Sequence, residues 1–200
     1  MSSNQFLEAV KGRRSYYGLN NEEIVSRERI EEIIATAVAH APSAMDSKSA
    51  RVVVLFGDKH EKLWDITKNT LKPIVPAEAF ASTEEKLNSF RSGYGTILFY
   101  DDQKVVKGLE EKFELYKANF EPWSLQSSGM LQFIIWTALE SEGLGASLQH
   151  YNPLIDNEVS EAFGISKDFK LIGQLVFGNP VAEPSEKIVE DLTHRLKVIN

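Results

Sequence analysis

Two adjacent arginines followed by a hydroxyl residue, Arg13, Arg14 and Ser15, are the residues near the N-terminus that could do chemistry. They come directly after Gly12, where a helix expected over residues 4–11 ends. Guanidinium groups make forked, charge-assisted hydrogen bonds to phosphate oxygens, so these residues could grip a phosphate. The alternative is a basic cluster that only balances the charge of an acidic protein.

A second group that could bind a ligand lies in a loop of small residues after a helix expected over residues 26–40. Pro42 ends that helix, because proline disfavours helical backbone in the residue before it. Ser43, Asp46 and Lys48 follow in the loop, and loops carried on helix ends commonly hold ligands. The alternative is a plain connection between two elements.

The third candidate stretch is Leu148, Gln149 and His150, within a short strand expected over residues 146–151. Gly145 precedes this stretch and allows the backbone to come close to a neighbouring group. The pattern is compatible with a segment that leads the chain past a flat ligand, and equally with ordinary core packing.

Motifs for activated nucleophiles, metal ions and nucleotides are absent from the sequence. The four histidines are scattered and match no metal-ligand spacing, and there is no cysteine. There is also no GxSxG elbow, P-loop or GxGxxG fingerprint. Chemistry without an activated side chain is chemistry supplied by a cofactor.

Composition narrows the class of protein. The 200 residues suit a single domain over residues 1–200. The net charge of −7 and the pI near 5.2 argue against a general nucleic-acid binder, because phosphate neutralisation needs an excess of Lys and Arg. The absence of cysteine excludes disulfides and is compatible with a reducing compartment. With no signal-peptide core and no membrane-spanning run, we expect a cytoplasmic protein.

The element expected to organise the fold is a helix that is apolar on nearly every side. Over residues 130–139 only two polar residues interrupt the apolar ones, which is typical of a helix inside a core with no face left for solvent. We expect Ser127 or Ser128 to cap its start, after Pro122 has ended the preceding helix. Gly143 is expected to end it.

The remaining pattern mixes helices and strands without strict alternation, so the class is α+β. Asp58 is expected to cap the helix after the first strand, and that strand is expected to be covered on both faces. Asp101 and Asp102 are expected to form a turn, and Gly178 to end the last strand. The helices are expected over residues 4–11, 26–40, 58–71, 78–90, 103–118 and 156–163, and the strands over residues 51–56, 96–100, 146–151 and 169–177.

Several short motifs occur in order along the chain: Arg13-Arg14-Ser15, Ala41-Pro42-Ser43, Gly143-Leu144-Gly145-Ala146, Leu148-Gln149-His150-Tyr151, and Gly178-Asn179-Pro180 with Pro184 and Lys187. Together they resemble the nitroreductase family of FMN-dependent oxidoreductases, and are most similar to its short branch of fatty-acid-repression-type proteins. Each motif alone is weak, but the ordered set spans nearly the whole chain.

The resemblance implies an α+β, nitroreductase-like fold with a central, mainly antiparallel sheet flanked by helices. It also implies an intertwined homodimer with two FMN sites at the subunit interface. By this analogy, Arg13, Arg14 and Ser15 hold the phosphate and ribityl side of FMN, and Lys187 supplies a second cation. The residues that would reach the flavin ring are Pro42, Ser43, Asp46 and Lys48 from the partner subunit, and Leu148, Gln149 and His150 along the edge near N5.

The chain departs from the family at Asp46 and Lys48, where Asn and Gln are common. An amide donates and accepts hydrogen bonds, whereas an ionised carboxylate only accepts them. Two charges about 4 Å apart interact by about 4 kcal/mol at an effective dielectric of about 20. We therefore expect Asp46 and Lys48 to form a compensated pair near the isoalloxazine.

The activity that the resemblance implies is a ping-pong reaction in which NAD(P)H reduces FMN and a flat oxidant, a nitroaromatic or a quinone, then takes the electrons at the same flavin face. Two alternatives stay open. One is a flavin-binding regulatory or redox-sensing protein with little turnover. The other is a cofactor-free dimeric interaction module, in which Arg13 and Arg14 are only surface charge.

Overall fold

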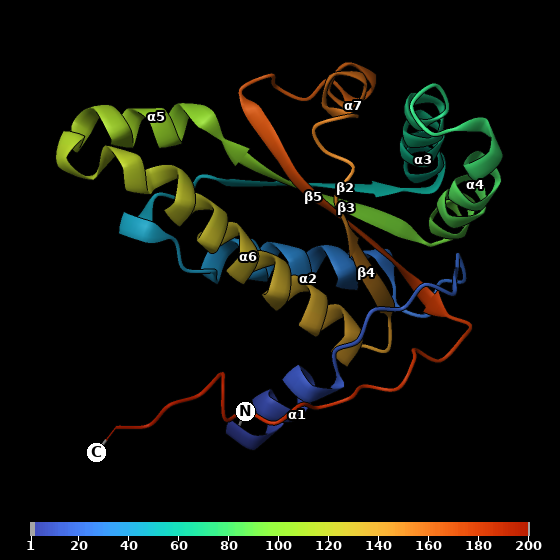
Figure 1. Ribbon diagram of the computed structural model, residues 1–200, viewed down its shortest axis with the longest axis horizontal. Helices are drawn as coiled ribbons and strands as arrows, with labels where there is room; N and C mark the ends of the chain where they lie inside the picture. Colours follow the sequence, from blue (N-terminus) through green and yellow to red (C-terminus); the bar gives the residue numbers. More distant parts are fainter. Residues whose placement is uncertain (1–2, 200) are drawn as a thin grey trace.

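Three long antiparallel strands form the centre of the computed structural model, which describes residues 3–199 (Figure 1). β3 (Gly95–Asp102) lies between β2 (Ala50–Phe56) and β5 (Phe169–Pro180). β4 (Gly145–Gln149) and the two-residue β1 (Leu19–Asn20) also pair with β5, again antiparallel. The expected α+β class and the antiparallel sheet are therefore confirmed.

One face of the sheet packs against α2 (Arg27–His40) and α6 (Lys117–Ser141). Side chains alternate along β3, so that Ile97 and Phe99 point to this face and pack with α2 and α6. Ile135 of α6, in the same cluster, is completely buried. This layer carries the long helix whose middle and C-terminal end border the two cavities described below.

The other face of the sheet is covered by α3 (Gly57–Leu71), α4 (Ala77–Arg91) and α7 (Asp156–Phe163). Leu98 and Tyr100, the alternate residues of β3, pack into this second cluster. Every residue of β3 is buried, which agrees with the continuous apolar run of a strand covered on both faces. Figure 1 shows α3, α4 and α7 grouped at the opposite side of the sheet from α2 and α6.

Two helix boundaries follow local chemistry as expected, and a third does not. The Ser26 side chain caps α2 by accepting a hydrogen bond from the backbone N–H of Arg29 at 3.2 Å. Gly143, with φ 93°, follows the end of α6, in a conformation open to glycine. The cap predicted at Asp58 is wrong, because α3 starts earlier and Asp58 lies in its first turn.

Pro122 does not end a helix, contrary to the prediction. α5 (Gln103–Lys112) stops before a short 3-10 turn (Glu114–Tyr116), and α6 then begins at Lys117 with Pro122 inside it. The helix expected over residues 103–118 is therefore two elements, and α6 begins well before the predicted serine caps. Proline removes one backbone donor from the helix, and burial of Phe120 on the same turn favours the continuous helix.

The interior of α6 is not buried on every side. The hydroxyl of Ser127, predicted as a cap, instead donates to the carbonyl of Trp123 at 2.8 Å within the helix. Leu125, Met130 and Ile134 are each more than a third exposed in the single chain. The prediction that this helix leaves no face for solvent is therefore wrong for the isolated chain.

The ends of two strands also differ from the prediction. Asp101 and Asp102 continue β3, where Asp102 caps α5 by accepting from the N–H of Lys104 at 3.0 Å. β5 extends through Gly178 to Pro180, because this end pairs with β1, which the sequence patterns did not indicate. β2 lies at the end of the strand order and most of its side chains are only half-buried. They still pack on both faces of the sheet, Val53 against one cluster and Val52 and Val54 against the other, which agrees with the expected cover.

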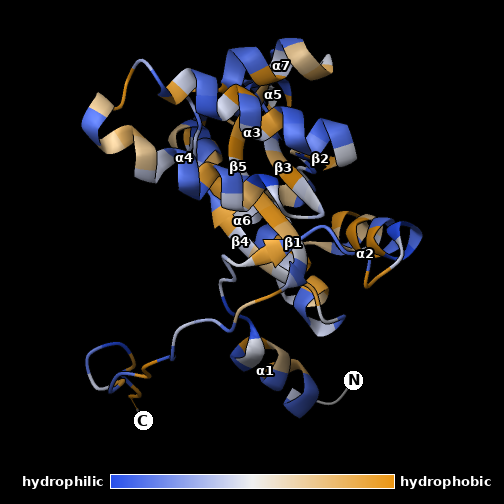
Figure 2. Cartoon of the chain, turned by 90° about the vertical axis from the view of Figure 1, so that its right-hand side faces the viewer, coloured by the Kyte–Doolittle hydropathy of each residue, from blue (hydrophilic) through white to orange (hydrophobic). Residues whose placement is uncertain are grey.

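The N-terminal helix and the C-terminal segment project from the same end of the molecule (Figures 1 and 2). α1 (Ser3–Gly12) has no buried residue, and Phe6 and Leu7 are about half exposed. The segment after Pro180 contains no helix or strand up to residue 199 and exposes several apolar side chains, among them Ile188. No helix within residues 3–199 combines the length and apolar content needed to cross a bilayer.

Candidate functional site

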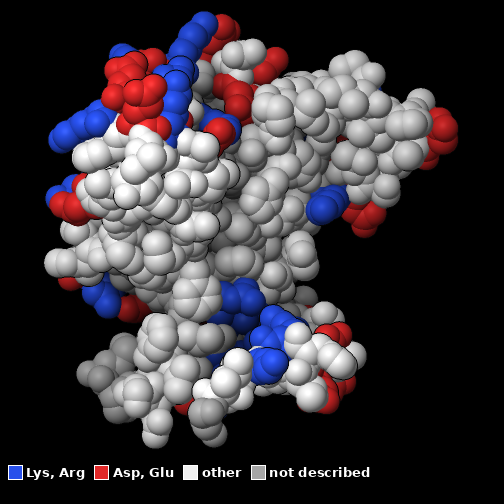
Figure 3. Space-filling view, turned by 60° about the vertical axis from the view of Figure 1, so that its left-hand side comes forward, with Lys and Arg blue, Asp and Glu red and all other residues white. Residues whose placement is uncertain are grey.

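Arg13 borders a cavity of about 190 Å³ at the C-terminal end of α6. Residues from the end of α1, the end of α6 and the end of β5 meet there. Figure 3 shows Lys and Arg atoms gathered in a recess between the main body and the lower part of the molecule. The residues that line this cavity are Ala9, Gly12, Arg13, Tyr16, Glu140, Ser141, Gly143, Leu144 and Pro180.

Arg13 places a buried cation at this cavity. Its guanidinium carbon lies 4.2 Å from the centre of the Trp136 ring, within the range of a cation–π contact. Its Nη1 atom is buried and has no hydrogen-bond partner among the described residues. A buried donor of this kind needs an acceptor, and a phosphate oxygen would supply one.

Glu140 lies beside both arginines. Its carboxylate accepts from the backbone N–H of Arg14 and from the indole N–H of Trp136, each at 2.7 Å. Burial raises the pKa of the Glu140 carboxyl to about 7, although these two hydrogen bonds and the charges of Arg13 and Arg14 act in the opposite direction. The site therefore contains a carboxyl group that titrates near neutral pH.

The segment after α1 is tied to the body at two points. The backbone N–H of Tyr16 donates to the carbonyl of Ala146 in β4 at 2.9 Å. The Arg14 side chain donates from Nη2 to the carbonyl of Ser185 in the C-terminal segment. Ser15, between them, is half-buried. Of the three predicted residues, Arg13 lines the cavity, and Arg14 and Ser15 follow it directly in the chain. Their role in binding a phosphate stays a prediction.

A second cavity of about 450 Å³ lies beside the loop after α2. Four of the predicted flavin-contacting residues line it, together with side chains of α2, β2 and α6. The lining residues are Val38, Ala39, His40, Ala41, Pro42, Ser43, Asp46, Lys48, Ala50, Arg51, Ser127 and Leu131.

The loop at the second cavity has an unusual backbone. Met45, Asp46 and Lys48 have φ values of 53°, 52° and 49°, in the left-handed region that non-glycine residues rarely adopt. A conformation of this kind persists only where surrounding contacts hold it. The short 3-10 turn over Ala44–Asp46 lies within this segment.

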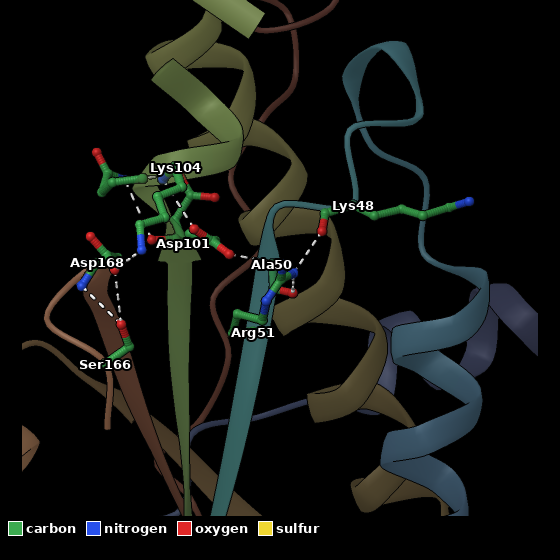
Figure 4. A network of polar contacts seen from close by, with 9 residues as sticks. Lys48, Ala50, Arg51, Asp101, Lys104, Ser166 and Asp168 are labelled. Atoms are coloured by element: carbon green, nitrogen blue, oxygen red, sulfur yellow. Dashed lines mark hydrogen bonds and ion pairs between the residues drawn. The ribbon is translucent and has the colours of Figure 1, made fainter. Parts of the chain in front are cut away.

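Three hydrogen bonds hold the loop. The Ser43 hydroxyl accepts from the backbone N–H of Lys48 at 3.0 Å, and the Ser127 hydroxyl of α6 accepts from the N–H of Ala44 at 3.2 Å. Arg51 donates from Nη1 to the carbonyl of Lys48 at 2.7 Å. In Figure 4 the Lys48 side chain extends away from Arg51, so that Arg51 contacts Lys48 at its carbonyl.

Arg51 is itself anchored to the neighbouring strand. Its Nη2 donates to the Asp102 carboxylate at the end of β3 at 2.9 Å (Figure 4). The strained loop is therefore connected to the rigid edge of the sheet through one guanidinium group.

Asp46 and Lys48 form the ion pair that the sequence predicted, with 2.9 Å between carboxylate and ammonium. Both side chains are about three-quarters exposed in the single chain. Exposed pairs of this kind contribute little to stability. The predicted position of the pair beside a flavin stays a prediction.

The remaining predicted residues line neither cavity. Leu148 and Gln149 lie in β4, where Gln149 is buried and donates to the Ser147 hydroxyl at 3.2 Å. His150 follows the strand and is exposed, and Lys187 lies exposed in the C-terminal segment. Their predicted roles at the flavin edge and the phosphate stay predictions.

The first cavity lies at the C-terminal end of α6 and the second beside its middle, and the two share none of their lining residues. Leu131 borders the second cavity and Glu140 the first, and nine residues of helix correspond to about 14 Å along its axis. One subunit therefore presents two separate groups of predicted ligand-binding residues.

The sequence patterns missed Glu140 and Trp136. Their four-residue spacing puts them on one side of a helix, and a carboxylate at the end of an apolar helix is a detectable signal. The partnership with Arg13 and Arg14 was not detectable, because more than 120 residues separate the two segments in the sequence.

The whole chain is similar to proteins named as nitroreductases. Nitroreductase FRM2 of Saccharomyces cerevisiae is 31% identical over 185 residues, which cover 91% of each protein. Nitroreductase CinD from Lactococcus lactis, solved in complex with chloramphenicol, is 41% identical and superposes with a TM-score of 0.90 over 98% of this chain and 100% of that one. CinD has also been solved in complex with 4-nitrophenol.

A more distant structure, from Desulfovibrio desulfuricans and in complex with FMN, is 18% identical and covers 100% of this chain and 99% of its own, with a TM-score of 0.71. It shares the fold. The Nitroreductase family itself is matched over residues 10–179. The chain therefore belongs to the nitroreductase family of oxidoreductases.

Proposed function

We propose that this chain is an FMN-dependent oxidoreductase that uses NAD(P)H to reduce nitroaromatics or quinones. The observation that carries the proposal is Arg13, which lines the first cavity and whose buried Nη1 atom has no hydrogen-bond partner among the described residues. A buried cationic donor fits an anionic ligand such as the phosphate of FMN. Membership of the nitroreductase family makes FMN the ligand of choice.

The chain's residues would divide the work of holding FMN. Arg13, Arg14 and Ser15 would bind the phosphate and ribityl side, with Lys187 as a second cation from the C-terminal segment. Bound FMN would supply the redox chemistry, accepting a hydride at N5 from NAD(P)H and delivering electrons to an oxidant. The protein then needs no general base, which agrees with the lack of a nucleophile motif in the sequence.

The ring would be held by the other two groups. Pro42, Ser43, Asp46 and Lys48 would approach it from the partner subunit, and backbone groups of Leu148, Gln149 and His150 would run along its edge. The strained loop backbone supports this role, because strained conformations are concentrated at ligand sites.

The separation of the two cavities supports an intertwined homodimer. If each FMN needs residues of both cavities, which lie beside the middle and at the C-terminal end of α6, a second subunit would supply one of the two sets. Exposed apolar side chains on α6 and α1 support this assembly, because contiguous apolar surface marks interfaces.

The substrate class rests on CinD, whose structures contain chloramphenicol and 4-nitrophenol. Both are nitro-substituted aromatic molecules, flat enough to stack on a flavin. A ping-pong mechanism is proposed because one open flavin face would serve NAD(P)H and the oxidant in turn.

The test begins with the absorbance spectrum of the purified protein and an anaerobic titration with NADH and NADPH. A flavin band that is bleached by one of them, and turnover when a nitroaromatic or quinone is added, support the proposal. A flavin that is reduced with no turnover points instead to a redox-sensing protein. A colourless protein that does not bind added FMN at micromolar concentration overturns the proposal in favour of a cofactor-free dimer.

A further inference from the structure

Glu140 forms hydrogen bonds to two groups that hold the arginines at the first cavity, the backbone of Arg14 and the indole of Trp136. One of its carboxylate oxygens accepts from the backbone N–H of Arg14, and the other accepts from the indole N–H of Trp136. The same indole ring carries the Arg13 guanidinium on its face, at 4.2 Å. One carboxylate therefore fixes the backbone at Arg14 directly and the side chain of Arg13 through Trp136.

We propose that Glu140 is a positioning residue that holds Arg13 and Arg14 in place for a phosphate group and makes phosphate binding depend on pH. The proposal rests on the proposed FMN function for the identity of the natural ligand. The contacts among Glu140, Trp136 and the two arginines concern binding of a phosphate group, whichever molecule carries it. Glu140 need not touch the ligand or the reacting atoms.

The hydrogen-bond geometry explains why a carboxylate stands at this position. Both donors to Glu140 are N–H groups, and each takes a different oxygen. A glutamine offers one acceptor oxygen and an amide that only donates, so it would satisfy one of the two donors. An alanine would leave both without this partner and free the Trp136 ring to rotate away from Arg13.

The charges around Glu140 decide the direction of the pH dependence. Arg13, Arg14 and Tyr16 face it from the segment after α1, and Glu183 of the C-terminal segment acts on the same Tyr16. Burial raises the pKa of Glu140 to about 7. A phosphate beside it would raise this pKa further, because two like charges disfavour each other.

Linkage then requires that phosphate binds more tightly when Glu140 is protonated. Affinity should fall as the pH rises through about 7, by tenfold for each unit by which the ligand raises the pKa of Glu140. The second ionisation of the phosphate of FMN, with a pKa of about 6, acts in the opposite direction. The contribution of Glu140 is therefore measured against a variant that cannot ionise.

The experiment measures dissociation constants at pH 6 and pH 8 for three probes, namely FMN, riboflavin and inorganic pyrophosphate. The proteins are the wild type, Glu140→Gln, Glu140→Ala and the matched control Glu142→Gln. Glu142 lies two residues further along, outside the cavity, and pairs with Arg29 at 2.6 Å. Thermal melting shows that each variant is folded.

We expect Glu140→Ala to weaken binding of FMN and pyrophosphate by about tenfold or more, because charge-assisted hydrogen bonds position both arginines. Riboflavin lacks the phosphate, so its dissociation constant from Glu140→Ala should be within about twofold of its dissociation constant from the wild type. Glu140→Gln should retain part of the affinity at pH 6. The ratio of wild-type to Glu140→Gln affinity for FMN should fall about threefold or more from pH 6 to pH 8. Glu142→Gln should behave as the wild type.

If Glu140→Ala does not fold, Trp136→Phe takes its place, since it keeps an aromatic ring under Arg13 and removes the N–H that binds Glu140. It too should weaken FMN binding more than riboflavin binding.

Folded variants that bind FMN as the wild type does at both pH values would overturn the positioning role and leave the proposed function standing. A wild type that binds pyrophosphate in a Glu140-dependent way but not FMN would support the positioning role and overturn the proposed function. A wild type that binds neither FMN nor pyrophosphate would overturn both the positioning role and the proposed function.

Discussion

The Nη1 atom of Arg13 is buried without a partner among residues 3–199, a state that costs folding free energy in the absence of a ligand. Proteins keep unfavourable local features of this kind at binding sites, where a ligand can supply the missing partner. The Trp136 ring beneath the guanidinium and the Glu140 carboxylate beside it keep the group in place. At the scale of the residue, these contacts support the proposal that the cavity at the end of α6 binds an anion.

Asp46 is the residue whose substitution tests the second cavity. We expect Asp46→Asn to raise the reduction potential of bound FMN by about 10–20 mV, because less negative charge would oppose reduction and an exposed, paired charge acts weakly. Lys48, 2.9 Å away, already offsets part of that charge. An anaerobic redox titration of the two proteins measures the shift.

Asp58→Asn serves as the control, since Asp58 is exposed in α3 and lines neither cavity. A potential that is the same for wild type and Asp46→Asn would place Asp46 away from the flavin ring. A shift that Asp58→Asn reproduces would be a general charge effect.

At the scale of the helix, Pro122 was predicted to end an element and instead lies inside one, which provides a stability test. The residue lies inside α6, where proline lacks the N–H that would bond to the carbonyl four residues earlier. We expect Pro122→Ala to raise the free energy of unfolding by about 1–3 kcal/mol, because it restores that hydrogen bond. Urea unfolding at constant pH measures the change.

Ala118→Gly is a suitable comparison, because it lies one turn earlier on an exposed position of the same helix and should lower stability by about 1 kcal/mol. If Pro122→Ala is less stable than the wild type, the proline shapes α6 in a way that its neighbours require.

His60 connects three elements through a chain of hydrogen bonds. The indole N–H of Trp64 donates to the Thr96 hydroxyl at 3.1 Å, and that hydroxyl lies 2.8 Å from Nδ1 of His60. Nε2 of His60 lies 3.1 Å from the carbonyl of Arg91, an acceptor. A neutral imidazole with its proton on Nε2 satisfies both contacts, so α3 joins β3 and the end of α4 without a buried charge.

The pKa of His60 predicts an acid-sensitive core. Burial lowers this pKa to about 4, below the 6.5 of an unfolded histidine. Between these values the unfolded chain binds more protons than the folded one, so the contribution of His60 to stability is complete above about pH 6.5 and is lost as the pH falls toward 4. The shift corresponds to about 3 kcal/mol.

NMR of the imidazole protons provides the direct measurement, and we expect the His60 signals to stay unchanged from pH 8 to pH 5. Glu140 has the opposite effect on the pH dependence of the unfolding free energy. Its raised pKa makes the folded state bind more protons between about pH 4.5 and 7, so its contribution to stability falls as the pH rises through this range. Unfolding free energies should therefore be compared in the Glu140→Gln background. A His60 signal that titrates near pH 6.5 would show that the imidazole is accessible to water.

At the scale of the whole molecule, the exposed apolar side chains of α6 predict an interface between two copies of the chain. Ile134 lies in the middle of α6 and is 37% exposed. We expect Ile134→Lys to convert the dimer to monomers and to abolish FMN binding, because a charge in an apolar interface is costly and each site would lose one of its halves. Sedimentation velocity with a flavin spectrum measures both effects.

Leu115→Lys is the matched control, since Leu115 is 86% exposed in the 3-10 turn before α6 and should leave the dimer intact. A variant at Ile134 that stays dimeric would place the interface elsewhere. A wild type that is a monomer and still binds FMN would contradict the division of the site between two subunits.

Much of the architecture was predictable because it depends on local chemistry. Ser26 and Pro42 mark the two ends of α2 through a cap and a stop, and the apolar run of residues 96–100 indicated a buried strand. Pro122, Asp101 and Gly178 were misjudged for the opposite reason, because packing against distant segments overrode their local preferences. A single domain over residues 1–200 stays a prediction, as does a cytoplasmic location.

The sequence by itself determined the class of fold and the family, and it made Arg13, Arg14 and Ser15 candidate phosphate ligands, because residue types and their order are local properties of the chain. Only the tertiary structure decided that Glu140 and Trp136 stand beside those arginines, and that the predicted ligand-binding residues fall into two separate groups. The physical reason is that charge, hydrogen bonding and burial act between neighbours in space, and the folding of α6 against the N-terminal segment determines which residues become neighbours.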